Sequence, residues 1–173
     1  MSDTVTTKKE TTAGNYFVSN YPPFSCWNPQ QVPQALAALE TPPAPGTPLG
    51  LYLHIPFCRK RCHFCYFRVY TDKNAQDVGS YLDLLATEWD RYGALPAIAE
   101  RDLSFIYFGG GTPSFLSTDQ LRGLVDRITA TKSWSRAEEI TFECEPGTLS
   151  EKKLSVIRDI GVTRLSQIGR AHV

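Results

Sequence analysis

From residue 50 onward, the apolar residues of this chain alternate between two spacings. Short apolar runs at 51–55, 103–108 and 139–145 have the length and the content of β-strands. The segments between them carry apolar residues three and four positions apart, which is the period of a helix with one buried face. The pattern therefore predicts strands and helices in regular alternation.

Three helices are predicted in this alternation. The first covers 76–92, the second covers 119–130 behind a cap at Thr118, and the third begins after Ser150 and ends at Gly161. Their inward-facing residues are expected to be Val78, Tyr81, Leu82, Leu85 and Trp89, then Leu121, Leu124, Val125 and Ile128, and finally Leu154, Ile157 and Ile160.

A fourth strand starts with VTRLS at 162–166. A repeated order of strand, helix and strand requires parallel strands joined by right-handed crossovers. The apolar character of the strands favours a sheet that is covered on both faces. We therefore predict an α/β fold, a partial (β/α) barrel of parallel strands that stops after about three β/α units.

The first 49 residues lack this alternation. They begin with a polar, Thr- and Lys-rich stretch that predicts an unstructured tail, followed by an aromatic and Pro-rich segment, 15–31, that predicts an extended arm. A short helix is expected from Val32, and the proline and glycine content of 41–50 predicts a linker. We therefore treat 1–49 as tail, arm and linker, and 50–166 as the N-terminal half of a larger core domain.

The end of the chain, QIGRAHV at 167–173, has no pattern that would complete the fourth unit. The codons ATC-GGA-AGA-GCA-CAC-GTC encode IGRAHV, and this string looks like a common short-read sequencing adaptor whose leading AG completes a Gln codon. We expect 167–173 to be non-native and the natural protein to continue; the alternative is a natural terminus. A sheet cut at this point leaves one edge and one apolar face uncovered, and we expect the fragment by itself to be inactive.

Composition narrows the classes of partner and compartment. The chain has 173 residues, of which 42% are hydrophobic and 12% aromatic, as one globular domain requires. Its 18 Lys and Arg balance 18 Asp and Glu, so the charge favours no nucleic-acid partner. No run reaches the roughly 18 apolar residues of a membrane span, and no signal peptide is expected. Five cysteines, an odd number, favour a reducing compartment, and we expect a cytoplasmic protein.

Three of the cysteines, Cys58, Cys62 and Cys65, follow the first strand within the run CRKRCHFC. Three thiolates can hold a 4Fe–4S cubane and leave its fourth iron open to a ligand, which allows chemistry as well as electron transfer. Two alternatives remain open. One is a zinc site with His54 or His63 as the fourth ligand, and the other is a redox pair of the last two cysteines.

Two further motifs also lie just past the ends of strands. Gly109–Gly111 let the backbone approach a ligand closely, although a plain turn is an alternative, and neither a P-loop nor a dinucleotide fingerprint is present. Glu143 and Glu145 alternate on the third strand and point to one face, where a carboxylate can orient a cationic ligand or ribose hydroxyls. Since open α/β sheets and (β/α) barrels build their sites at this edge, the three motifs are expected to cooperate.

The sequence does not assign a single role to four further features: His54, the basic run at 59–61, Cys144 and Cys26. His54 shares a strand face with Tyr52 and either orders the cysteine loop or is an ordinary core histidine. The basic run at 59–61 is either a solvated surface or a means of tuning a cluster or attracting an anionic substrate. Cys144 is expected to be a small core residue, and Cys26 has no assignment.

The motifs resemble those of a known family. CRKRCHFC is the CxxxCxxC signature of radical S-adenosylmethionine (SAM) enzymes. YLHIPFC, FGGGTPS, ECEP and VTRLS, in this order over 50–166, resemble the oxygen-independent coproporphyrinogen III oxidase group, which also includes haem chaperones. The resemblance implies that the partial barrel is the N-terminal half of a radical SAM core.

The resemblance also implies roles for single residues. Cys58, Cys62 and Cys65 would hold the 4Fe–4S cluster, and SAM would bind the open iron through its amino and carboxylate groups. One electron would then cleave SAM to methionine and a 5′-deoxyadenosyl radical, which abstracts hydrogen from the substrate. The positions that match SAM contacts of the family are Tyr52, Phe64, Gly110, Gly111, Thr112 and Glu143. No catalytic residue is assigned.

The motifs identify the substrate less clearly than they identify the cofactors. The oxidase has a further cysteine two positions past the third, where this chain has Phe67 and the haem-chaperone branch also has an aromatic residue. The resemblance implies an oxidase-like enzyme that converts two propionates of coproporphyrinogen III to vinyls with loss of carbon dioxide. A haem-binding chaperone and a radical SAM enzyme on a non-porphyrin substrate are the alternatives. The expected partners are a small molecule, such as a porphyrinogen or haem, and an electron donor such as flavodoxin or ferredoxin.

Overall fold

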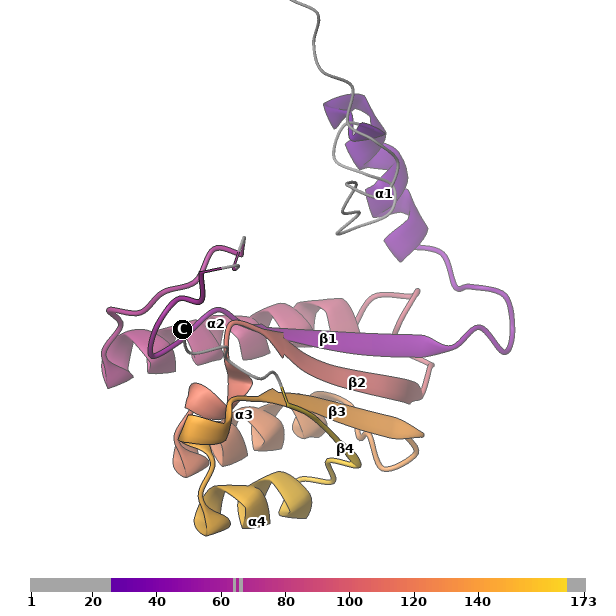
Figure 1. Ribbon diagram of the computed structural model, residues 1–173. Coiled ribbons are helices and arrows are strands. Elements are labelled where there is room, and N and C mark those ends of the chain that lie inside the picture. The colour runs from indigo at the N-terminus through magenta and orange to yellow at the C-terminus, as the bar shows by residue number, and fades with distance from the viewer. Residues whose placement is uncertain (1–25, 64, 66, 168–173) are drawn as a thin grey trace, which may run out of the picture. The chain divides into compact units, whose positions relative to one another are not determined.

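The computed structural model of the chain describes residues 26–63, 65 and 67–167 (Figure 1). The chain divides into two units, 1–38 and 39–173, and each is described by itself. The predicted tail and the first part of the predicted arm lie outside the described residues, as does the end of the chain from 168.

The first unit contains a short 3-10 helix, η2 (Pro29–Gln31), which continues into α1 (Val32–Leu39). The Asn28 side chain accepts a hydrogen bond from the Gln30 backbone N–H and so caps the start of η2. The helix expected from Val32 is confirmed. The arm is not extended throughout, because its last three residues form η2.

The second unit is a four-stranded parallel sheet in the order β1-β2-β3-β4, with a helix after each of the first three strands (Figure 1). The strands are β1 (Leu49–Ile55), β2 (Leu103–Gly110), β3 (Glu139–Cys144) and β4 (Arg164–Gln167). The helices are α2 (Ala75–Gly93), α3 (Thr118–Thr131) and α4 (Glu151–Asp159). Short 3-10 turns, η3 (Pro113–Phe115) and η4 (Pro146–Thr148), follow β2 and β3. The predicted α/β fold with parallel strands is confirmed.

Reciprocal hydrogen bonds fix where two of the helices begin. Asn74 and Asp77 form a capping box at the start of α2, and Ser117 and Gln120 form another at the start of α3. The cap expected at Thr118 is therefore wrong by one residue. Ser117 has the extended backbone of a cap, whereas Thr118 is already the first helical residue.

The third helix, α4, is capped by Ser150, which accepts from the Lys153 N–H, and its last residue is Asp159. Gly161, whose φ is 91°, terminates the turn that follows it. Leu154 does not face the core as expected, since 40% of its surface is exposed. The three residues expected to face inward, Leu154, Ile157 and Ile160, are spaced by three, so on a helix of 3.6 residues per turn their direction changes from one to the next. The buried face is therefore centred on Val156 and Ile157, and Leu154 lies on its flank.

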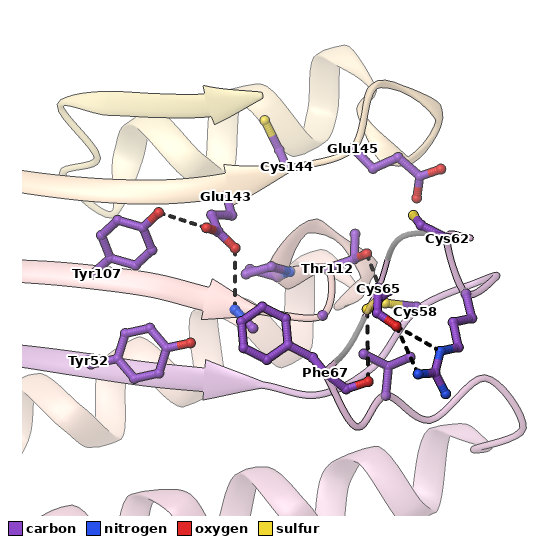
Figure 2. Close-up of a pocket in the computed structure, with 15 residues that line it drawn as sticks. Tyr52, Cys58, Cys62, Cys65, Phe67, Tyr107, Thr112, Glu143, Cys144 and Glu145 are labelled. Atoms are coloured by element: carbon purple, nitrogen blue, oxygen red, sulfur yellow. Dashed lines mark hydrogen bonds between the residues drawn. The ribbon is translucent and has the colours of Figure 1, made fainter. Parts of the chain in front are cut away.

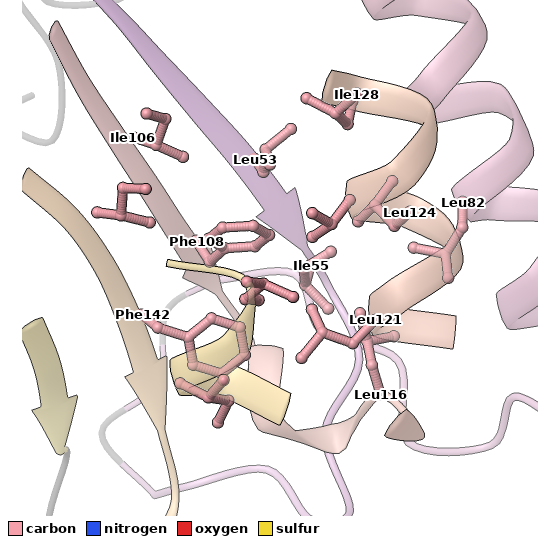
Figure 3. Packing of buried hydrophobic residues seen from close by; sticks show 14 of the residues in the cluster. Leu53, Ile55, Leu82, Ile106, Phe108, Leu116, Leu121, Leu124, Ile128 and Phe142 are labelled. Carbon is pink, nitrogen blue, oxygen red and sulfur yellow. The ribbon is translucent and has the colours of Figure 1, made fainter. Parts of the chain in front are cut away.

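The hydrophobic core lies between the sheet and its helices (Figure 3). From the strands it receives Leu53, Ile55, Ile106, Phe108 and Phe142, and from α2 and α3 it receives Leu82, Leu121, Leu124 and Ile128. Each such side chain contributes about 1.5–3 kcal/mol when it is fully buried. This core fixes the strands in register and so fixes the loops at their carboxyl ends.

The opposite face of the sheet is open. Consecutive parallel strands with crossovers of one hand place all three helices on the same side. On the other side, Tyr52 is 54% exposed and Phe105 is 37% exposed. Within the described residues, the sheet is thus covered on one face only, which agrees with the expectation of one uncovered apolar face and not with that of cover on both faces. The apolar strands reflect one face in the core and an aromatic row on the other.

Among the described residues, none of the helices combines the length and the apolar character that crossing a bilayer requires.

Candidate functional site

A cavity of about 280 Å³ opens where β1, β2 and β3 end (Figure 2). All three sequence motifs contribute to its wall. Cys58, Cys62 and Cys65 line it together with Tyr52, Gly110, Gly111, Thr112 and Glu143. The predicted site residues are thus brought together, apart from Phe64, which lies outside the described residues.

The loop that carries the cysteines is held at both ends by backbone hydrogen bonds. The Cys58 N–H donates to Tyr70 O (3.0 Å), and the Tyr70 N–H donates to Pro56 O (2.9 Å). Within the loop, the Arg61 guanidinium donates to Cys65 O through Nη2 (2.8 Å). The three cysteines therefore stand on a closed loop that is anchored to the end of β1.

Other contacts connect the cysteine loop to the motifs after β2 and β3. Arg59 Nη1 donates to Gly147 O (3.0 Å). The Gly111 N–H donates to Ile55 O (2.8 Å), and the Thr112 N–H donates to Phe57 O (2.9 Å). Two members of the basic run at 59–61 thus have structural partners, which the solvated-surface interpretation did not anticipate.

The glycine run is required by the packing of the protein on itself. Gly110 has a φ of 115°, a conformation that favours glycine, and a Cβ there would lie 2.8 Å from His54 Cε1. A Cβ on Gly109 would lie 2.7 Å from the Tyr107 ring, and a Cβ on Gly111 would lie 2.9 Å from Cys58 Sγ. The sequence suggested ligand approach as the reason for these glycines; close contact with neighbouring protein atoms is a further reason.

Glu143 is held by two donors at the cavity wall (Figure 2). Tyr107 Oη donates to Glu143 Oε1 (2.7 Å), and the Gly110 N–H reaches Glu143 Oε2 (3.3 Å). Burial and the bond to Glu143 raise the pKa of Tyr107, so this phenol remains a donor at neutral pH. Tyr107 was not predicted from the sequence. Its position two residues before Gly109, on the same strand face, was the available signal.

Tyr52 and His54 form a neutral polar pair beside this carboxylate. Tyr52 Oη lies 3.1 Å from His54 Nδ1, and the Tyr52 ring stacks on Tyr107 with a centroid separation of 5.9 Å. Burial, with a smaller effect of Glu143, raises the pKa of Tyr52 to about 12, and burial lowers the pKa of His54. Both side chains are therefore uncharged at neutral pH.

The remaining predicted residues take different positions. Glu145 lines the same cavity as Glu143, as the alternation along β3 predicts. Cys144 is buried, and its Sγ lies 3.7 Å from Ser166 O, which confirms its role as a core residue. Cys26 is exposed and belongs to the first unit. None of the five cysteines, all of them in the described residues, forms a disulfide.

Buried hydroxyl groups connect the loops behind the cavity. Thr112 Oγ1 donates to Cys58 Sγ (3.3 Å), and Ser114 Oγ pairs with Thr148 Oγ1 and accepts from the Glu145 N–H (3.0 Å). These three hydroxyl-bearing residues are buried. Sequence reasoning did not find this network, because it joins residues that are distant along the chain.

A model of the family described as the Radical SAM superfamily matches residues 52–167. The chain belongs to the radical SAM superfamily. The matched region contains the carboxyl ends of β1, β2 and β3, both glutamates of the cavity and all three clustered cysteines. The cavity described above is therefore part of this radical SAM domain.

The chain is similar to two kinds of named relative, a haem chaperone and a coproporphyrinogen III oxidase. "Heme chaperone HemW" of Bacillus subtilis (strain 168) is 37% identical in an alignment of 134 residues that covers 70% of this chain and 35% of that protein. "Oxygen-independent coproporphyrinogen III oxidase" of Salmonella typhimurium is 35% identical over 122 residues, 70% of this chain and 26% of that protein. The structure of coproporphyrinogen III oxidase (HemN) from Escherichia coli matches with a TM-score of 0.66 and 30% identity, covering 88% of this chain and 34% of that one.

The predicted resemblance to the oxidase group and its haem chaperones is therefore confirmed. The chain spans about a third or less of the length of these relatives. The four parallel strands and their helices correspond to part of a HemN-like radical SAM fold.

Membership of the radical SAM superfamily implies a 4Fe–4S cluster and SAM as cofactors. The donor set fits, because three thiols, which are soft ligands, line one cavity. In the described part of the chain, no three His, Cys, Asp or Glu side chains converge closely enough to hold a metal ion.

Proposed function

We propose that this protein holds a 4Fe–4S cluster on Cys58, Cys62 and Cys65 and cleaves SAM in the adjoining cavity. The observation that carries the proposal is the convergence of the cysteine loop, the glycine run and Glu143 on one cavity at the carboxyl ends of parallel strands. When bound, the cluster and SAM supply a 5′-deoxyadenosyl radical through one-electron cleavage of a carbon–sulfur bond. An electron donor such as flavodoxin or ferredoxin would provide the electron.

The residues of the chain prepare the cavity for a cationic ligand. The Glu143 carboxylate, fixed by Tyr107 and by the Gly110 N–H, can accept hydrogen bonds from an ammonium group or from ribose hydroxyls. Tyr52 adds a neutral aromatic wall. Burial and neighbouring backbone groups keep Cys58 at the base of the loop, while Cys62 and Cys65 remain partly exposed.

Within haem metabolism we propose an oxidase-like activity on propionates of a porphyrinogen. The solved HemN structure and the curated oxidase support this assignment. A haem chaperone is the second candidate, favoured by the HemW relatives and by Phe67, which lines the cavity where the oxidase resemblance calls for a cysteine. Two anaerobic assays on a cluster-loaded, full-length version of the protein separate the candidates. With SAM, a reductant and coproporphyrinogen III, loss of two molecules of carbon dioxide, detected by mass spectrometry, supports the oxidase. With added haem, a Soret band from bound haem, together with no decarboxylation in the first assay, supports the chaperone.

The cluster itself is tested by anaerobic reconstitution of the 173-residue chain with iron and sulfide. We expect iron–sulfur absorbance in the wild type and its loss in Cys62→Ala. Cys26→Ala is the matched control, since this cysteine lies in the other unit, and it should load normally. In a full-length version of the protein, reduction in the presence of SAM should yield 5′-deoxyadenosine, and Cys62→Ala should abolish this product. Full cluster absorbance in Cys62→Ala, or preferential uptake of zinc by the wild type, would refute the assignment.

A further inference from the structure

The Thr112 hydroxyl is directed at a cysteine sulfur and not at the helix that Thr112 begins. Thr112 occupies the cap position of η3, where threonine commonly accepts a backbone hydrogen bond, yet its side chain makes no such bond. Its Oγ1 donates instead to Cys58 Sγ at 3.3 Å. The Thr112 hydroxyl thus bonds to the cysteine loop and does not cap η3.

The surroundings hold this contact in place. Thr112 is 5% exposed and Cys58 is 6% exposed, so little water reaches either group. The Thr112 N–H donates to Phe57 O, one residue before the cysteine. Gly111 lies so close that a Cβ there would stand 2.9 Å from the same sulfur. The hydroxyl therefore has a fixed direction relative to Cys58 in a region of low dielectric, where a hydrogen bond to a charged group is strong.

We propose that Thr112 raises the electron affinity of the cluster by donating this hydrogen bond to the Cys58 thiolate. The inference rests on the proposed function, because it requires that Cys58 is a cluster ligand. Reduction adds one electron to the cluster and increases the negative charge on its sulfur ligands. A donor to such a sulfur stabilises the reduced form more than the oxidised form, and hydrogen bonds to sulfur are among the determinants of cluster potential. Thr112 is thus a positioning and tuning residue for the thiolate.

The family resemblance implied that Thr112 contacts SAM, so the test must exclude SAM. The reconstituted wild type and variants are titrated anaerobically with dithionite in the absence of SAM, and the reduced cluster is followed by electron paramagnetic resonance. Thr112→Val removes the hydroxyl and keeps the branched shape. We expect about a tenfold loss of electron affinity, which is about 59 mV to lower potential for a one-electron couple.

Two controls separate the hydroxyl from general damage. Thr112→Ser retains the donor and should keep the wild-type potential. Thr141→Val makes the same substitution at another buried threonine, whose hydroxyl bonds to Glu139, and should also leave the potential unchanged. Iron content is measured for every variant.

The outcomes are distinct. A loaded Thr112→Val cluster at the wild-type potential overturns the inference, as does a Ser variant that shifts as far as the Val variant. If Thr112→Val does not load, Thr112→Ala removes the same hydroxyl and takes its place. Failure of both to load while Ser loads also overturns the inference, since the hydroxyl would then serve assembly and not potential. A wild type that takes up no cluster refutes the proposed function, and the inference with it.

Discussion

Glu143 shows how a single carboxylate can be prepared for a ligand before the ligand arrives. Its two oxygens have separate donors, Tyr107 Oη and the Gly110 N–H, which come from the strand next to its own. The phenol stays protonated because its pKa is raised. A carboxylate fixed in this way loses little side-chain freedom when it accepts a further hydrogen bond from a bound molecule.

We predict that Tyr107→Phe weakens SAM binding to the cluster-loaded protein about tenfold, which is about 1.4 kcal/mol. The substitution keeps the ring that stacks on Tyr52 but removes the donor to Glu143, so the carboxylate is free to turn away from the cavity. Anaerobic isothermal titration calorimetry measures the affinity. Tyr92→Phe, at an exposed tyrosine of α2, is the control and should bind as the wild type does. Equal affinities in the two variants would contradict this role of Tyr107.

Sequence reasoning found the cluster cysteines from their local spacing, but it missed Tyr107 and the contacts that pair site residues distant along the chain. The three cysteines stand within eight residues, so their ligand pattern is visible in the sequence alone. Tyr107 and Glu143 are separated by 36 positions, and Thr112 and Cys58 by 54. Their pairing depends on the register of parallel strands and on loop geometry, which no local pattern encodes.

For the helices too, local spacing predicted the location, whereas contacts with distant residues decided the details. Apolar spacing located α2, α3 and α4, and it identified the inward faces of the first two. It failed at Leu154 because the direction of the buried face depends on where the sheet lies against α4. It also misplaced the start of α3, since Ser117 and Thr118 are both suitable caps and the capping box with Gln120 decides between them.

We predict that Ser117→Ala lowers the free energy of unfolding by about 1 kcal/mol, the usual cost of losing a helix cap. The serine side chain accepts from the Gln120 N–H (3.1 Å), and alanine leaves that donor without its partner. Thr118→Ala is the matched control and should cost far less, because Thr118 is the first residue inside the helix. Urea denaturation followed by circular dichroism measures both. A larger loss in Thr118→Ala than in Ser117→Ala would show that the cap has been misassigned.

At the level of the molecule, core and site are kept on different parts of one sheet. The helices and the core occupy one face, while the cavity is at the carboxyl ends of the strands and continues onto the open face through Tyr52 and Tyr107. Packing therefore holds the scaffold with few of the residues that face the cavity; Cys144 belongs to both the core and the cavity lining. The sequence predicted the parallel order of the strands and one uncovered apolar face, although the apolar strands also favoured a sheet covered on both faces.

Because only one face of the sheet is covered, two phenylalanines of β2 differ in burial and therefore in their contribution to stability. Phe108 is fully buried against Phe142 and Trp134, whereas Phe105 lies on the open face and is 37% exposed. We predict that Phe108→Ala costs about 3–5 kcal/mol, because it leaves a cavity in the core. This is a large part of the roughly 5–15 kcal/mol that stabilises a typical domain. Phe105→Ala should cost about 1 kcal/mol or less, since surface substitutions rarely cost more. Urea denaturation of both variants measures the difference. An equal cost would mean that the open face is packed in solution, and size-exclusion chromatography would then show whether a second copy of the chain covers it.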